Sequence, residues 1–206
     1  MAAVMGNVTH STFGNHRGPP SRRGREAYPT PAIAVVELHE VETIALSVLN
    51  PCGTPGDAIS TVLTKRGHRV VCNDIAHGGV DFLTMTEAPR GVECVVMNAP
   101  FSLSADFVAH ALDLGIQKVC VLQRLAWSEC GTSTTRRKPE TERRRALFQR
   151  QHLERIWMFG TRLPRMHRLD WDGKEASATL NCAWFVFCAD HHGKADFDWI
   201  WGDRND

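Results

Sequence analysis

The sequence predicts an α/β fold with a mostly parallel central sheet and an antiparallel hairpin at its C-terminal edge. Short apolar runs alternate along the chain with stretches whose apolar residues recur at helical spacing, which is the pattern of repeated strand and helix units. The run from Lys118 to Leu122 is apolar at almost every position, as in parallel strands that helices cover on both faces. A glycine-containing turn separates the first predicted strand from the helix that follows, a layout typical of nucleotide-binding sheets.

The elements of the first half follow from proline, glycine and apolar spacing. A helix is expected from Pro31, because apolar residues recur at helical spacing from 34 to 44 and proline suits a first helical turn. A strand is expected over 46–49, and a helix over 58–66, which Gly67 ends. The next strand, 69–73, leads into Asp74, and a strand over 92–97 leads into Asn98.

The second half continues the alternation. A helix is expected over 103–114, because Phe107, Ala111 and Leu114 share one face. The strand over 118–122 comes next, and a polar, arginine-rich stretch then leads into a helix over 143–152. The last two strands, 155–159 and 179–188, flank a loop of about twenty residues and are expected to pair antiparallel at the sheet edge.

Composition favours one globular unit. The 206 residues and 43% hydrophobic content suit a single domain, expected over 27–206. Residues 1–26 are rich in Gly, Pro, Ser, Asn and Arg without a hydrophobic period, which predicts a flexible basic arm. No apolar run approaches the roughly 20 residues that span a bilayer, and the N-terminus has no hydrophobic signal core, so we expect a cytoplasmic protein.

Charge, cysteine and histidine usage narrow the classes of binding site. The net charge of +1 gives no whole-molecule attraction to polyanions, so nucleic-acid binding would depend on local clusters. The seven cysteines include no CxxC pair and mostly lie in apolar runs, which favours reduced, buried thiols over disulfides or zinc. Adjacent His191 and His192 cannot easily face one ion, so no metal site is expected.

The segment Asn98-Ala99-Pro100-Phe101 suits a flat heterocycle that has an amino group. An Asn carbonyl can accept a hydrogen bond from an exocyclic amine, proline restricts the backbone, and a Phe ring can stack on a base. The segment resembles the Asn-Pro-Pro-Phe/Tyr motif of amino-group DNA methyltransferases, most closely the adenine-modifying type, with Ala99 in place of the first proline. The resemblance implies a Rossmann-like methyltransferase fold in which Asn98, Pro100 and Phe101 are catalytic; a strand that simply ends in a turn is the alternative.

The turn after the first strand resembles the acid-Pro-x-x-Gly-x-Gly loop of S-adenosyl-L-methionine-dependent enzymes. It reads Asn50-Pro51-Cys52-Gly53-Thr54-Pro55-Gly56, with Asn50 in place of the acid, Thr54 in place of the first glycine, and Pro55 removing one backbone donor. Such a loop approaches the cofactor closely through residues without a Cβ. An ordinary tight turn is the alternative, but its position between a strand and a helix favours the cofactor loop.

Three further segments appear in the order that the family shows. Tyr28-Pro29-Thr30-Pro31 resembles its Tyr-x-Thr-Pro element, and Asp81-Phe82-Leu83 resembles an Asp-Phe-Leu segment that contacts the adenine of the cofactor. Asp74, about twenty residues after the glycine loop, can accept both ribose hydroxyls, although a helix-capping Asp is the alternative. The resemblance therefore implies S-adenosyl-L-methionine as cofactor, held by Tyr28, Thr30, Asn50, Gly53, Gly56, Asp74, Asp81 and Phe82.

Cationic residues in the C-terminal third are candidates for phosphate contacts. The region 161–177 mixes cations with Trp171, which suits backbone contact and base stacking. With the segment 122–127, it resembles parts of compact phage-type adenine methyltransferases, whereas a solvated helix face is the alternative for the arginine-rich stretch. The candidates are Arg136, Arg137, Lys138, Arg162, Arg165, His167, Arg168 and Lys174.

These segments lead to one functional expectation. The chain resembles DNA adenine-N6 methyltransferases of phage or prophage type, and the resemblance implies methyl transfer from S-adenosyl-L-methionine to the exocyclic amine of adenine in DNA. The sequence does not give the oligomeric state, and a monomer is the default expectation. Two alternatives stay open. One is a nucleic-acid-binding protein of this fold that has lost its activity, and the other is a methyltransferase for RNA or for a protein glutamine.

Overall fold

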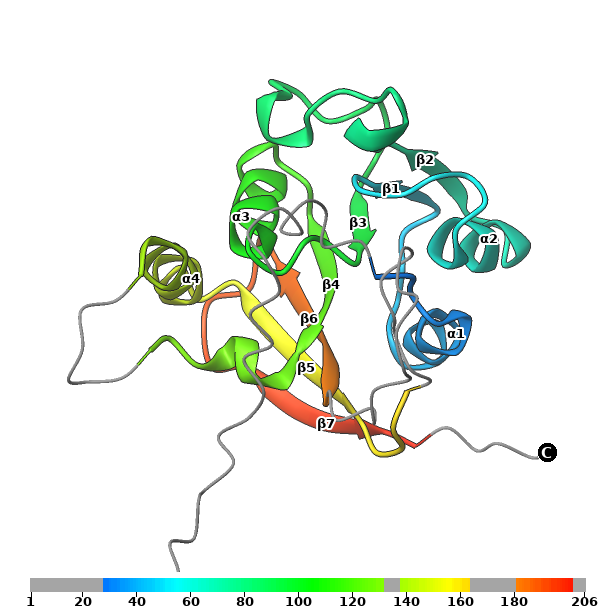
Figure 1. Ribbon diagram of the computed structural model, residues 1–206. Coiled ribbons are helices and arrows are strands. Elements are labelled where there is room, and N and C mark those ends of the chain that lie inside the picture. The colour runs from blue at the N-terminus through cyan, green and yellow to red at the C-terminus, as the bar shows by residue number, and fades with distance from the viewer. Residues whose placement is uncertain (1–27, 132–137, 164–180, 202–206) are drawn as a thin grey trace, which may run out of the picture.

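The computed structural model describes residues 28–131, 138–163 and 181–201, and a seven-stranded sheet lies at its centre (Figure 1). The strands lie in the order β2-β1-β3-β4-β6-β5-β7, and β6 is antiparallel to both of its neighbours while the other pairs are parallel. The α/β fold with a mostly parallel sheet is therefore confirmed. The strands are β1 (Ser47–Asn50), β2 (Arg69–Cys72), β3 (Cys94–Met97), β4 (Lys118–Arg124), β5 (Leu153–Phe159), β6 (Cys182–Cys188) and β7 (Asp196–Ile200).

The predicted antiparallel pairing of the last two expected strands is present between β5 and β6. β6 also pairs with β4 along its whole length, and β7 lies outside β5 as a further parallel strand that the sequence analysis did not include. Four of the five residues of β7 are exposed and only Ile200 is buried. No apolar run marks this strand, because Asp196 and Asp198 alternate with the exposed aromatic residues Phe197 and Trp199.

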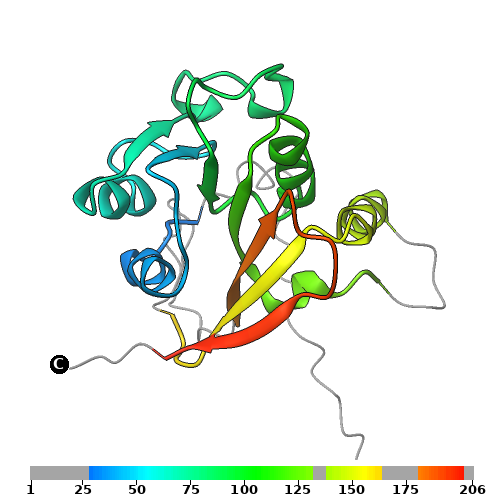
Figure 2. The ribbon, with the colours of Figure 1, turned by 180° about the vertical axis from the view of Figure 1, so that it is seen from behind.

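Helices cover both faces of the sheet (Figures 1 and 2). α1 (Ala32–Val41) and α2 (Ala58–Lys65) pack on one face with Val48, Cys94 and Val96. The other face packs against α3 (Ser104–Asp113), to which α4 (Pro139–Gln149) is joined. Successive residues of β1 and β3 alternate between the two cores, as the pleat requires. None of the helices within the described residues is long and apolar enough to cross a membrane.

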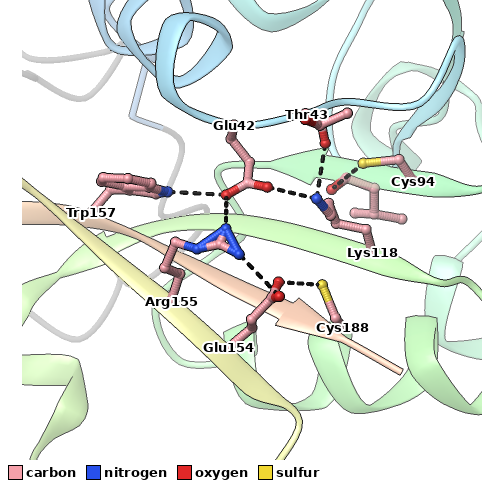
Figure 3. A network of polar contacts seen from close by, with 9 residues as sticks. Glu42, Thr43, Cys94, Lys118, Glu154, Arg155, Trp157 and Cys188 are labelled. Carbon is pink, nitrogen blue, oxygen red and sulfur yellow. Dashed lines mark hydrogen bonds and ion pairs between the residues drawn. The ribbon is translucent and has the colours of Figure 1, made fainter. Parts of the chain in front are cut away.

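A buried carboxylate joins the end of α1 to the amino ends of β4 and β5 (Figure 3). The side chain of Glu42 is 2% exposed and accepts hydrogen bonds from Lys118 Nζ at 2.6 Å, Arg155 at 3.1 Å and Trp157 Nε1 at 3.1 Å. Burial opposes the charge on Lys118, but the hydrogen bond and charge of Glu42 raise the pKa of Lys118 above its usual value. This network lies at the edge of the sheet opposite the strand ends that carry the candidate site.

Candidate active site

The candidate site lies at the carboxyl ends of β1 and β3, which are neighbours in the sheet. From β1 the chain crosses to β2 on one side and then returns to β3 on the other side of β1. Ligands of open α/β sheets bind at the point where the strand order reverses in this way. Asn50 ends β1 and Asn98 follows β3, so the two predicted segments meet at this position.

The glycine loop that leaves β1 is closed tightly at Gly53. The backbone N–H of Gly53 donates to the carbonyl of Asn73 at 3.1 Å. A Cβ at this position would lie 2.0 Å from Asp57 Oδ2 and 2.1 Å from Asn50 Nδ2, which no side chain tolerates. A Cβ at Gly56, in contrast, would meet no atom within 4 Å, so this end of the loop is open.

Asp57 organises the loop, a role that the sequence analysis missed. Its Oδ1 accepts from the backbone N–H of Ser60 at 2.8 Å, which caps the first turn of α2. Its Oδ2 accepts from the backbone N–H of Thr54 at 3.0 Å and from Asn50 Nδ2 at 2.8 Å. The position of an Asp directly before a predicted helix signals the cap, but the two loop contacts depend on the folded turn.

Asn50 lies beneath the loop and retains one unused acceptor. The residue is 1% exposed, and its Nδ2 donates to Asp57 and, at 3.3 Å, to Ser60 Oγ. Its Oδ1 is buried and has no hydrogen-bond partner among the described residues. A buried acceptor without a donor is unfavourable, so this oxygen is suited to a ligand that brings an N–H group.

Cys52 connects the glycine loop to the Asn98 segment, and this contact was also absent from the sequence analysis. Burial raises the pKa of its thiol to about 12, the charges of Asp74 and Asp57 add to the increase, and a hydrogen bond with the backbone of Asn98 opposes it. The thiol is therefore protonated at neutral pH and does not act as a nucleophile. Asn98, Asp57 and Asp74 are all close enough to Cys52 to affect its pKa.

Asp74 lies at the expected edge of the sheet, where it caps the short 3₁₀ helix η2 (Ile75–His77). Its Oδ1 accepts from the backbone N–H of Ala76 at 2.7 Å, and its Oδ2 lies 3.3 Å from His77 Nδ1. The carboxylate thus has the geometry of the capping alternative. A ribose would take the place of these local contacts.

The Asp81-Phe82 segment is tied to the same edge by Asn73. Asn73 Nδ2 donates to the carbonyl of Val80 at 2.9 Å, and Asn73 Oδ1 accepts from the Val80 N–H at 3.0 Å. Asp81 is exposed and caps the short helix η3 (Phe82–Thr84). Phe82 is 2% exposed and packs against Phe107 and His110 in the core, so its present contacts are structural.

The Asn98 segment contacts the Tyr28–Thr30 segment, which lies about seventy residues earlier in the chain. Asn98 Nδ2 donates to the carbonyl of Tyr28 at 3.0 Å and to Thr30 Oγ1 at 3.1 Å. Because a backbone carbonyl is only an acceptor, these contacts set the orientation of the amide. The ring of Phe101 stacks with Tyr28 at 5.3 Å between centroids, and the guanidinium of Arg124 lies 4.6 Å from its centroid.

The predicted phosphate-binding residues are only partly described. Lys138, which directly precedes α4, and Arg162 are exposed. Arg143 in the arginine-rich stretch pairs with Asp106 on α3 at 2.8 Å, so its charge is already matched. The other candidates, Arg136, Arg137, Arg165, His167, Arg168 and Lys174, lie outside the described residues, as do the arm over 1–26 and most of the region 161–177.

The fold and this edge define an α/β protein of the Rossmann-like class with a candidate ligand site at its strand reversal.

No model of a protein family matches the chain, and the search of curated proteins found no match. Among solved structures, an O-methyltransferase from Agrobacterium tumefaciens, described as predicted, aligns over 82% of this chain and 85% of its own, with 11% identity and a TM-score of 0.44. A SAM-dependent methyltransferase from Thermotoga maritima aligns over 75% of this chain and 86% of its own, with 10% identity and a TM-score of 0.37. The sheet order of the chain itself defines the fold.

Proposed function

We propose that the protein binds S-adenosyl-L-methionine and transfers its methyl group to the exocyclic amine of adenine in DNA. One observation carries the proposal: the glycine loop after β1 and the Asn98 segment after β3 meet at the strand reversal, where Cys52 of the loop hydrogen-bonds the backbone of Asn98. Methyl transfer needs a donor and an acceptor held in line at close range. Two binding segments on neighbouring strand ends suit that requirement.

The residues present fit the cofactor. Asn50 Oδ1 is a buried acceptor without a partner among the described residues, which suits an ammonium group. Gly56 leaves the loop surface open, and Asp74 offers a carboxylate at the neighbouring strand end. When bound, S-adenosyl-L-methionine supplies an electrophilic methyl group on a sulfonium ion, and the protein supplies alignment.

Asn98 is suited to the target amine. Since its Nδ2 is engaged by Tyr28 and Thr30, its Oδ1 is the atom that can accept a hydrogen bond from an amine. Accepting that bond increases the electron density on the amine nitrogen, and this activation requires no general base with a shifted pKa. Phe101 provides the flat surface for the base, whose ring would replace Tyr28 or Arg124 against it.

The substrate is tested by transfer of a tritium-labelled methyl group to duplex DNA, RNA and whole-cell protein in parallel. Incorporation into adenine of DNA is expected. Incorporation only into protein or only into RNA would reject the DNA assignment and support the corresponding alternative.

The role of Asn98 is tested with a paired positioning variant. Asn98→Ala should abolish transfer while leaving the cofactor Kd within a few-fold, because the amide contacts the target and not the glycine loop. Thr30→Val removes one of the two acceptors that orient the amide, so kcat should fall about tenfold, the cost of roughly one hydrogen bond. Undiminished transfer by Asn98→Ala would remove this residue from catalysis.

One observation favours a second candidate, a nucleic-acid-binding protein of this fold without cofactor affinity. The carboxylate of Asp57 accepts the N–H groups of Thr54 and Ser60, two backbone donors that the loop would otherwise offer to a ligand. Isothermal titration with S-adenosyl-L-methionine separates the candidates. A binding heat and a rise in Tm support the enzyme, whereas the absence of both supports the binder.

A further inference from the structure

A second pocket lies beside the Asn98 segment. Its volume is about 220 Å³. A larger pocket of about 340 Å³ is lined by residues 39–44, but of these two only the smaller adjoins a predicted catalytic residue, Phe101. It draws its lining from the segment after β3, the end of β4, the following 3₁₀ helix η4 (Leu125–Ser128) and α4. The lining residues are Phe101, Gln123, Arg124, Ala126, Trp127 and Arg144.

The pocket carries a buried donor without an acceptor. Arg144 donates through one terminal nitrogen to the backbone carbonyl of Glu129, whereas its Nε is buried and has no hydrogen-bond partner among the described residues. A buried guanidinium N–H that lacks an acceptor is unfavourable. An anionic ligand with several oxygen atoms would satisfy it.

Among the described residues, no carboxylate forms an ion pair with the two arginines of the pocket. The cation of Arg124 lies over the Phe101 ring. The ion pairs between α4 and α3 use Arg143 with Asp106 and Arg150 with Asp113, and none within the described parts of the chain joins a carboxylate to Arg124 or Arg144. Two guanidinium groups therefore share a pocket with a flat aromatic surface.

We propose that this pocket binds a phosphate that flanks the target adenine, so that Arg124 and Arg144 hold the nucleotide while its base lies against Phe101. The inference rests on the proposed function for the identity of the base. Guanidinium groups match the geometry of phosphate oxygens, and aromatic rings stack with any base. Arg144 belongs to the arginine-rich stretch and Arg124 to the segment 122–127, but the sequence does not indicate that they share a pocket, because they are separated by twenty positions and meet only in the fold.

The test uses a short fluorescent oligothymidine with one central adenine, and a second copy in which neutral methylphosphonates replace the two phosphates that flank the adenine. Binding is measured by anisotropy with the full chain. For the wild-type protein, the methylphosphonates should weaken binding about tenfold, and Arg144→Gln should weaken binding of the unmodified strand by a similar factor. Combined, the two changes should weaken binding by clearly less than the product of the two separate factors, because both remove contacts to the same phosphate and only the contact of Arg124 remains to be lost.

Matched variants make the result specific. Arg145→Gln removes the neighbouring, exposed cation on α4, which does not line the pocket, and should change affinity less than twofold. Arg124→Gln is the second pocket variant if Arg144→Gln fails to fold, and it should be less sensitive to the methylphosphonates than the wild-type protein. Additive losses, equal effects of Arg144→Gln and Arg145→Gln, or no binding by the wild-type protein would each overturn the inference.

The methyl-transfer assay tests the proposed function, and the binding cycle with the methylphosphonate strand tests the phosphate pocket, so the two can fail separately. Methyl incorporation into adenine with additive losses in the cycle leaves the enzyme intact and rejects the phosphate pocket. A coupled cycle without any methyl incorporation establishes the pocket and rejects the enzyme.

Discussion

Among single residues, Gly53 is the position in the glycine loop where there is no room for a Cβ atom. We expect Gly53→Ala to reduce the free energy of unfolding by about 1–3 kcal/mol, because its Cβ would overlap Asp57 and Asn50 in a tightly packed turn. Urea unfolding measures the change. Gly56→Ala, in the same loop, should alter it by less than about 0.5 kcal/mol, since its Cβ enters open space. Equal effects of the two substitutions would contradict the close approach at Gly53.

Residues whose type suggests a role in binding or catalysis could be selected from the sequence. Residues that belong to the candidate site only because the fold places them there could not. Asn98, Tyr28 and Thr30 were each selected from the sequence as site candidates, and the fold brings them into contact. Cys52 and Arg144 carry no signal of their own, because a thiol in a turn and an arginine in a cationic helix are common. Their partners lie far along the chain and meet them only in the folded sheet.

At the scale of elements, two histidines join α1 to the turn before β2 through one chain of hydrogen bonds. An Arg66 nitrogen lies 2.9 Å from His39 Nδ1, the Nε2 atoms of His39 and His68 are 2.9 Å apart, and His68 Nδ1 lies 2.8 Å from the carbonyl of Ala45. Arginine only donates and a carbonyl only accepts, so the chain is complete when both imidazoles are neutral. Protonating either ring places two donors face to face.

This arrangement predicts that mild acid weakens the packing of α1 on α2. Burial and the nearby charge of Arg66 lower the pKa of His39 from its ordinary 6.5, so the unfolded chain binds this proton more readily than the folded chain. The contribution to stability is complete above pH 6.5 and is lost as the pH falls toward the lower folded value. Thermal unfolding at neutral and mildly acidic pH should therefore show a drop in Tm.

The His39→Gln variant isolates this effect. A glutamine amide offers an acceptor to Arg66 and a donor to His68 without titrating near neutral pH. Its Tm should fall less with acidification than that of the wild-type protein. An identical fall in both proteins would show that other groups set the acid sensitivity.

Elements with buried apolar runs were predicted well, and elements without them were not. β3 is buried at all four positions, and the sequence placed it within two residues of its observed ends. α4 begins at Pro139, earlier than expected, because its first turn is formed by Pro139 and two glutamates and not by apolar residues. β7 has mostly exposed side chains and was missed.

At the scale of the whole molecule, the carboxylate of Glu42 links parts of the chain that are far apart in sequence. Glu42→Gln should lower the free energy of unfolding by about 2 kcal/mol, less than for a fully buried pair, because Lys118 and Arg155 are each about a quarter exposed. Glu40→Gln is the matched control, since the Glu40 side chain is 62% exposed and pairs only with Arg66 in the described structure. The control should change stability by less than about 0.5 kcal/mol. A comparable loss in both variants would show that burial of the Glu42 network does not add to the free energy of unfolding.

Because β6 runs antiparallel to β4 and β5, the segment between β5 and β6 starts and ends on one side of the sheet. β5 ends, and β6 begins, at the same side of the sheet as Asn98, so the chain leaves at Gly160 and re-enters at Asn181 beside the candidate site. The strand pairings of the described residues do not involve 161–180, so substitution or exchange within this stretch would leave those pairings in place. If the proposed function holds, exchange of this stretch would alter the choice of substrate while leaving in place the strands that carry Asn50 and Asn98.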